Sequence, residues 1–190
     1  MLSRLKGVLP RSLKQAVSRL LQSVWESTAY RFSRNGSGGL AWRHIVFVCK
    51  GNICRSTFAD YYLRSRIPEG SMKVESCGLD VDQGAFSPPH AVQVGREFGL
   101  ELSGHRSKGV GECDLYNADL IVPMEYRHYL RLVEMFPEQR SKIRLLRDFA
   151  PWPVCLMCNT YDPYGLGHSE FRRCFRGMKR ALDKLLANTK

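Results

Sequence analysis

The chain has 190 residues, of which 44% are hydrophobic, and its formal net charge is +11. A chain of this length fits one globular domain with an appendage. Residues 1–43 contain eight Lys or Arg residues and one acidic residue, so the rest of the chain is only mildly basic. This uneven charge argues against a nucleic-acid-binding domain. No apolar run approaches the ~20 residues that a transmembrane helix needs.

The cysteines indicate a reducing compartment. There are seven of them, an odd number, and no secretory signal is evident, which favours free thiols and a cytoplasmic protein. Cys155 and Cys158 form a C-x-x-C pair, but a zinc site would need a second pair at ligand spacing. We therefore expect no metal. For this pair we favour ordinary loop cysteines over a redox or metal-binding role.

Residues 1–38 differ in composition from the rest of the chain and contain seven serines. Apolar residues recur there with the i, i+3, i+4, i+7 spacing of one helix face, at Leu13, Ala16, Val17, Leu20, Leu21 and Val24. Pro10 suits the start of this helix and separates it from a shorter amphipathic piece with Leu2, Leu5 and Leu9. The sequence NGSGG at residues 35–39 is typical of a flexible linker. We therefore divide the chain into a basic amphipathic extension with its linker, residues 1–38, and a domain, residues 39–190.

Three interpretations of the extension stay open. A basic amphipathic helix can lie on an anionic membrane surface, which would bring residues 1–34 into peripheral contact with a membrane. An Arg- and Ser-rich, acid-poor start is also typical of an organelle transit peptide. The third interpretation is a tethered helix without a function of its own.

After the linker, strand-like and helix-like segments alternate. Strands are predicted at residues 45–49, 72–77, 119–124 and 143–146, and helices at residues 57–67, 91–98, 125–135 and 169–187. A long loop rich in Pro, Gly, Cys and Asn is expected at residues 150–167. The alternation predicts an α/β three-layer sandwich with a four-stranded parallel sheet. Ligands of such sheets bind beyond the carboxyl ends of the strands, where Cys49 lies.

The sequence CKGNICRS at residues 49–56 has the features of a phosphate-binding loop. Gly51 and Asn52 tolerate positive φ, so successive backbone amides can face one anion. The helix that begins near Arg55 adds its positive dipole end, and the Arg55 guanidinium matches two phosphate oxygens. Such surroundings stabilise a thiolate, which is the nucleophilic form of Cys49. The alternative, a buried cysteine in a glycine turn, is disfavoured by Arg55 and Ser56 at the helix start.

Two separated motifs, VCKGNICRS at residues 48–56 and DPYG at residues 162–165, resemble those of the low-molecular-weight protein tyrosine phosphatases, bacterial branch. Further similar blocks are ESCGL at 75–79, LSGHR at 102–106, DLIVPMEYRH at 119–128 and IRLLRDF at 143–149. The resemblance covers residues 43–187. The loop before DPYG, however, is longer and more apolar than is usual in this family.

The resemblance implies a catalytic mechanism that needs no cofactor and no metal. Cys49 attacks the phosphorus of a phosphotyrosine, and Arg55 and the loop amides hold its oxygens. Asp162 protonates the leaving phenolate and then activates a water that hydrolyses the phosphocysteine. The implied phosphate-binding loop consists of Lys50, Gly51, Asn52, Ile53, Cys54, Arg55 and Ser56.

The resemblance also implies roles for residues around this loop. Ser76 and His105 are expected to support the shape of the loop through Asn52, while an ordinary surface role for His105 stays open. Cys54 is expected to form a reversible disulfide with the nucleophile, unless it only packs. Tyr164 is expected in the wall of the substrate pocket. The partner is expected to be a phosphotyrosyl protein, by analogy a bacterial tyrosine kinase.

Two rival functions share parts of this pattern. A thiol-dependent arsenate reductase would share the fold and the loop, but it needs resolving cysteines, and residues 123–149 contain none. A non-catalytic phosphate-binding scaffold would be expected to lose Cys49, Arg55 or Asp162, and all three are present. The sequence therefore favours the phosphatase.

Overall fold

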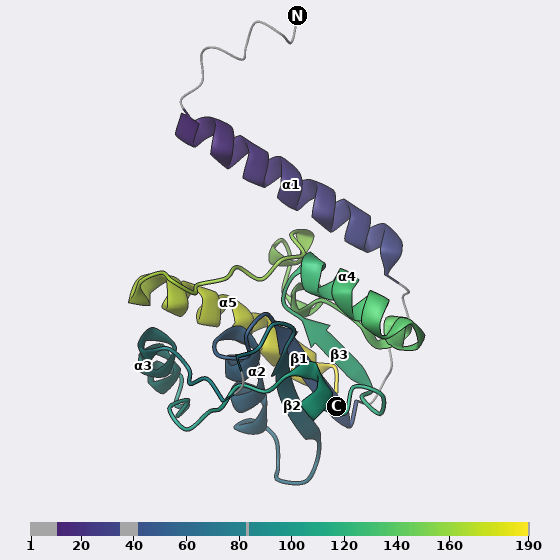
Figure 1. Ribbon diagram of the computed structural model, residues 1–190, viewed down its shortest axis with the longest axis vertical. Helices are drawn as coiled ribbons and strands as arrows, with labels where there is room; N and C mark the ends of the chain where they lie inside the picture. Colours follow the sequence, from purple (N-terminus) through teal and green to yellow (C-terminus); the bar gives the residue numbers. More distant parts are fainter. Residues whose placement is uncertain (1–10, 35–41, 83, 190) are drawn as a thin grey trace, which may run out of the picture.

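The computed structural model describes residues 11–34, 42–82 and 84–189 (Figure 1). The predicted amphipathic piece with Leu2, Leu5 and Leu9 and the predicted linker at residues 35–39 lie outside the described residues. Within them, the chain forms the expected succession of strands and helices, with the first strand leading into the loop that contains the phosphate-binding motif.

A parallel sheet forms the centre of the domain, in the strand order β2-β1-β3. β1 (His44–Cys49) pairs with β2 (Lys73–Gly78) and with β3 (Leu120–Pro123), both in parallel. All six residues of β1 are buried, because the strand is central and covered on both faces. This explains the uninterrupted apolar sequence of residues 45–49. The predicted α/β class with a parallel sheet is confirmed.

The sheet has three strands in the described residues, so the predicted fourth strand at residues 143–146 is wrong. Only a single bridge joins Ile143 to Ile121 of β3. The Arg144 amide donates to the Ile121 carbonyl at 2.9 Å, and the Leu145 amide, which faces away from β3, donates a hydrogen bond to the Tyr30 hydroxyl at 3.0 Å. The chain then turns into a short 3₁₀ helix, η4 (Leu146–Phe149).

Helices cover both faces of the sheet and produce three layers (Figure 1). Because side chains alternate along a strand, Ile45 and Phe47 of β1 face one core and Val46 and Val48 face the other. The first core is closed by α2 (Arg55–Arg64), α3 (Pro89–Glu97) and α5 (His168–Ala187). The second is closed by α4 (Tyr126–Met135). The shorter 3₁₀ helices are η2 (Val110–Glu112), η3 (Pro137–Lys142) and η5 (Val154–Leu156).

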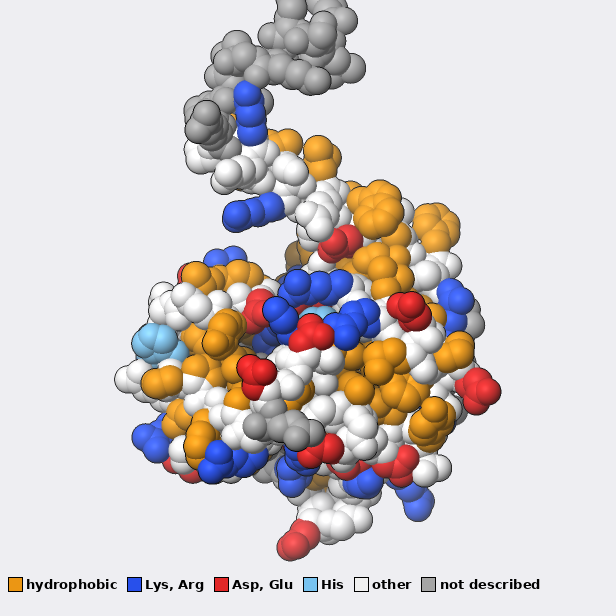
Figure 2. All heavy atoms as spheres, in the orientation of Figure 1, with side chains coloured by type: hydrophobic (Ala, Val, Ile, Leu, Met, Phe, Trp, Pro, Cys, Tyr) orange, Lys and Arg blue, Asp and Glu red, His pale blue; other side chains and the backbone are white. Residues whose placement is uncertain are grey.

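The helix of the N-terminal extension, α1 (Arg11–Ser33), is longer than its apolar periodicity suggested. Its C-terminal part packs on the domain through Tyr30, which is buried and makes an edge-to-face contact with Tyr129 of α4 at 5.1 Å between ring centroids. Its N-terminal part extends away from the domain (Figure 1). The apolar residues of that part, Leu13, Val17, Leu20, Leu21 and Val24, are all exposed, and Figure 2 shows hydrophobic side chains on the surface along this helix. Among the described residues, no helix is long and apolar enough to cross a membrane.

Candidate active site

The loop between β1 and α2 has the shape of an anion-binding nest. Asn52 has a φ of 50°, the left-handed region that asparagine tolerates better than most residues. The loop also passes very close to the end of β2. A Cβ atom at Gly78 would lie 2.7 Å from the Lys50 carbonyl oxygen and 2.8 Å from the Asn52 nitrogen, so only glycine fits at that position. This close approach brings the loop amides over the carboxyl end of the sheet.

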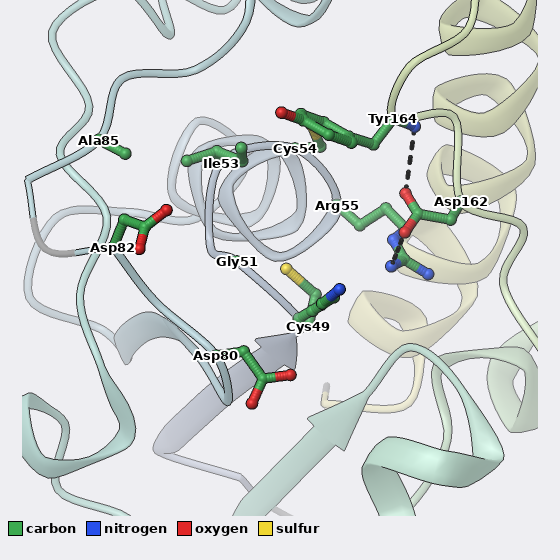
Figure 3. Close-up of a pocket in the computed structure, with 11 residues that line it drawn as sticks. Cys49, Gly51, Ile53, Cys54, Arg55, Asp80, Asp82, Ala85, Asp162 and Tyr164 are labelled. Carbon is green, nitrogen blue, oxygen red and sulfur yellow. Dashed lines mark hydrogen bonds and ion pairs between the residues drawn. The ribbon is translucent and has the colours of Figure 1, made fainter.

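The sulfur of Cys49 lies at the base of this loop, with two potential donors beside it. The Asn52 amide donates to Sγ at 3.2 Å, and the Ser56 hydroxyl lies 3.0 Å from Sγ. The Cys49 side chain is buried except where it faces the pocket (Figure 3). Donors directed at the sulfur stabilise a thiolate and, later in a reaction, a departing thiolate. This geometry fits a nucleophile.

Asn52 is held from several sides. Its side-chain nitrogen donates to Ser56 Oγ at 2.9 Å and to Ser76 Oγ at 3.0 Å. Its side-chain oxygen accepts the Lys108 amide at 2.9 Å, and its carbonyl oxygen lies 2.8 Å from Nε2 of His105. Burial lowers the pKa of His105, so the neutral ring donates from Nε2 to this carbonyl. The structure therefore brings both predicted support residues into contact with Asn52.

Arg55 connects the loop to the segment that contains Asp162. Its Nη2 lies 2.6 Å from Asp162 Oδ2, and its Nη1 donates to the Thr160 carbonyl at 3.0 Å and to Glu125 Oε1 at 2.5 Å. Burial opposes the guanidinium charge, but Cys49, Asp162 and Glu125 outweigh it and raise the pKa of Arg55. The cation is therefore permanent and is held in a fixed orientation at the side of the pocket (Figure 3).

Glu125 is a residue of the site that the sequence patterns did not reveal. It lies two residues after the end of β3, at the same edge of the sheet as Cys49, and its side chain is mostly buried. Burial alone would raise the pKa of Glu125, but the charge of Arg55 and the hydrogen bond from it lower that pKa below its usual value. The carboxylate thus stays ionised and fixes one end of the guanidinium. Its position directly after a predicted parallel strand was the signal that could have identified it.

The pocket above the loop contains the predicted catalytic residues together. Cys49, Arg55 and Asp162 line it with Lys50, Gly51, Ile53, Cys54, Asp80, Asp82, Ala85 and Tyr164. Figure 3 shows the Cys49 sulfur pointing into the space between Asp162, Asp80 and Ile53. The volume is about 200 Å³, below the ~300–1,000 Å³ of typical small-molecule sites. It suits one phosphorylated side chain better than a large cofactor.

The other cysteines are placed differently. Cys54 lines the same pocket and is buried, and burial followed by the nearby charge of Cys49 raises the pKa of its thiol. Cys155 lies in η5 and Cys158 two residues after it, both outside the pocket, and all these thiols are free. Among the residues that the structure describes, no group of three or more His, Cys, Asp or Glu side chains could hold a metal ion.

Comparisons with known proteins agree with this geometry. The family model described as low molecular weight phosphotyrosine protein phosphatase matches residues 44–190, which begin at β1 and leave α1 outside. The low molecular weight protein-tyrosine-phosphatase Wzb of Escherichia coli K12 is 38% identical over 140 residues, covering 74% of this chain and 90% of the relative.

Solved structures add the same result for the fold. Wzb from Escherichia coli K30 in complex with sulphate superposes with a TM-score of 0.70 at 28% identity, covering 78% of this chain and 99% of that one. The YwlE arginine phosphatase from Geobacillus stearothermophilus superposes with a TM-score of 0.69 at 29% identity, covering 76% and 91%. The two neighbours share the fold but are named for different phosphorylated side chains.

Proposed function

This chain belongs to the low molecular weight phosphotyrosine protein phosphatase family, whose members use a cysteine nucleophile and a phosphocysteine intermediate. We propose that it hydrolyses phosphotyrosine in proteins, with Cys49 as nucleophile, Arg55 as the phosphate-binding cation and Asp162 as general acid and base. One observation carries the assignment of residues: Arg55 joins Asp162 at 2.6 Å in the pocket into which the Cys49 sulfur points.

In the first step, the Cys49 thiolate attacks phosphorus while the bond to the phenolic oxygen breaks. The loop amides and the Arg55 guanidinium hold the equatorial oxygens, where negative charge accumulates in the transition state. Phosphoryl oxygens that enter the loop take over the guanidinium from Asp162. The released carboxylate takes up a proton from the bound substrate or from solvent, turns to the leaving oxygen and donates that proton to it.

In the second step, Asp162 accepts a proton from a water that attacks the phosphocysteine. The sulfur–phosphorus bond breaks, phosphate leaves, and the thiolate of Cys49 is restored. The Asn52 amide at 3.2 Å and the Ser56 hydroxyl at 3.0 Å stabilise the returning charge on sulfur. Asn52, with Ser76 and His105, is proposed to keep the amides aimed at the phosphate.

Phosphoarginine is a second candidate substrate, because Asp80 and Asp82 line the pocket and carboxylates suit a guanidinium. However, Asp80 already pairs with Arg131 at 2.7 Å. The opposite wall presents the apolar side chain of Ile53 and the ring of Tyr164, surfaces on which a phenyl ring packs (Figure 3). These walls favour phosphotyrosine.

The test compares purified full-length protein with Cys49→Ser and Asp162→Ala on phosphotyrosyl, phosphoseryl and phosphoarginyl peptides. We expect hydrolysis of the phosphotyrosyl peptide, no activity of Cys49→Ser, and a loss of about 10²–10⁴-fold for Asp162→Ala. Faster hydrolysis of the phosphoarginyl peptide than of the phosphotyrosyl peptide would show that phosphoarginine, not phosphotyrosine, is the substrate class. Arsenate reduction with thioredoxin, without hydrolysis of aryl phosphates, would show that the protein is an arsenate reductase and not a phosphatase.

We further propose that the enzyme is cytoplasmic, acts on a phosphotyrosyl protein such as a bacterial tyrosine kinase, and contacts membrane surfaces through residues 1–34. The exposed apolar residues of α1 and the basic residues of the extension support the membrane contact. Full-length protein should sediment with vesicles containing phosphatidylserine, and Val17→Glu combined with Leu21→Glu should abolish this. Equal sedimentation of both proteins would refute the membrane contact.

A further inference from the structure

The loop that leads to Asp162 is held by α1. The buried Cys158 amide donates to Ser27 Oγ at 3.1 Å. The Ser27 hydroxyl donates its own proton to the Ser23 carbonyl at 2.6 Å, so its lone pair is directed at the loop. Cys158 lies four residues before Asp162. A residue outside the family match therefore contacts the segment that delivers the proposed general acid.

A second contact from α1 reaches the next residue of the loop. Glu26 accepts a hydrogen bond from the side-chain nitrogen of Asn159, whose side-chain oxygen accepts the Tyr126 amide at 2.7 Å. Tyr126 is the first residue of α4 and follows Glu125, which holds Arg55. Asn159 thus joins α1 to the start of α4.

From Asn159 the chain passes directly into the catalytic pocket. The Thr160 amide donates to the Met124 carbonyl at 2.7 Å, and the Thr160 carbonyl accepts Arg55 Nη1 at 3.0 Å. Two residues later, Asp162 meets Nη2 of the same arginine. The contacts of α1 are therefore continuous, residue by residue, with those that place the proposed general acid.

We propose that Glu26 and Ser27 are positioning residues for the general acid, so that α1 is a working part of the active site. This inference rests on the proposed role of Asp162. The segment 150–162 contains only η5 as regular structure, and its length leaves many backbone groups to be held by outside partners. A displacement of about 1 Å at a catalytic group lowers rates up to ~10²-fold, so anchors three and four residues away matter.

The test uses the full chain and two substrates that differ in their need for an acid. The leaving group of 2,4-dinitrophenyl phosphate departs without a proton, whereas that of phenyl phosphate needs one. The ratio of their kcat/KM values reports proton donation and is independent of how much of a preparation is folded. The variants are Glu26→Ala with Ser27→Ala, and as a matched control Thr28→Ala, whose exposed hydroxyl donates to the Val24 carbonyl of its own helix.

The double variant should lose about tenfold in kcat/KM for phenyl phosphate, a fraction of the ~10²–10⁴-fold that a general acid supplies, and less than about twofold for the dinitrophenyl ester. Thr28→Ala should match wild type on both. In an Asp162→Asn background the double variant should cause no further selective loss, because the acid is already absent.

Equal losses on both esters, or no loss on either, would overturn the inference while leaving the proposed mechanism intact. The same selective loss in the Asp162→Asn background would also overturn it. If Asp162→Asn itself does not discriminate between the esters, the proposed role of Asp162 fails and the inference fails with it.

Discussion

Replacing Glu125 by glutamine removes one charge from a buried ion pair without changing the shape of the side chain. Glu125 Oε1 lies 2.5 Å from Arg55 Nη1, and the Arg55 side chain is 2% exposed. The amide oxygen of the introduced glutamine could still accept a hydrogen bond, so the loss is mainly that of charge assistance. Asp162 at 2.6 Å and the Thr160 carbonyl at 3.0 Å remain as partners of the guanidinium.

The expected destabilisation follows from these contacts. A hydrogen bond to a charged group contributes about 1.5–3 kcal/mol, against about 0.5–1.5 for a neutral one. Complete removal of a buried partner costs about 3–5 kcal/mol, but here the hydrogen bond and two other acceptors persist. We therefore expect Glu125→Gln to lower the free energy of unfolding by about 1–2 kcal/mol at pH 7. Urea unfolding followed by circular dichroism measures it.

The pH dependence gives the same prediction a second check. The pKa of Glu125 is lower in the folded protein than its usual value, so the folded state favours the ionised carboxyl. Its contribution is complete above the unfolded value of about 4.3 and is lost as pH falls through the lower folded pKa. The difference in unfolding free energy between wild type and Glu125→Gln should therefore shrink as pH falls below about 4.3.

A matched control is Glu97→Gln, which alters a pair with Arg172 on the exposed surface. Its urea midpoint should stay near that of wild type, because exposed pairs contribute little. A Glu125→Gln protein as stable as wild type at pH 7, or a difference that grows on acidification, would refute the reasoning about the buried pair.

Three further outcomes are expected. Gly78→Ala should abolish phosphatase activity with a folded circular dichroism spectrum, because its Cβ would displace the Asn52 amide that faces the sulfur; retained activity would show that the loop tolerates the shift. Tyr30→Phe should lower the free energy of unfolding by about 1–3 kcal/mol, since the buried Leu145 amide loses its acceptor; unchanged urea unfolding would contradict this. Cys54→Ser should leave activity largely intact, but thiols should no longer restore activity after inactivation by hydrogen peroxide, because Cys49 can no longer be protected as a disulfide. Full recovery with dithiothreitol would exclude Cys54 as the redox partner.

The parts of the fold that the sequence predicted well are those encoded locally. The apolar run of β1, the turn residues Gly51 and Asn52, and the helix that starts at Arg55 are neighbours in sequence, and each depends on its own conformational preference. The strand–helix alternation predicted the parallel sheet correctly because it too is encoded locally. Periodicity also identified the face of α1 at Leu13 and the following turns, which the structure leaves exposed.

The parts that could not be predicted depend on partners far apart in the chain. Glu125 acquires its importance from an arginine 70 positions earlier, and nothing adjacent to it indicates that pairing. The predicted fourth strand ends after one bridge as the chain enters η4, and the Leu145 amide beside it donates to Tyr30, 115 positions earlier. The docking of α1 uses Glu26, Ser27 and Tyr30, and the apolar periodicity gave no indication of that contact.

The continuity of α1 determines how the enzyme can be presented to a surface. The helix runs without interruption from Arg11 to Ser33, a length of about 35 Å. One end is seated on the domain by Tyr30, and the other projects beyond it. If a surface binds the projecting end, the continuous helix holds the domain at one orientation relative to that surface. The direction in which the Cys49 pocket opens would then also be fixed relative to the surface. Substrates would be selected by the height of their phosphorylated side chains above that surface.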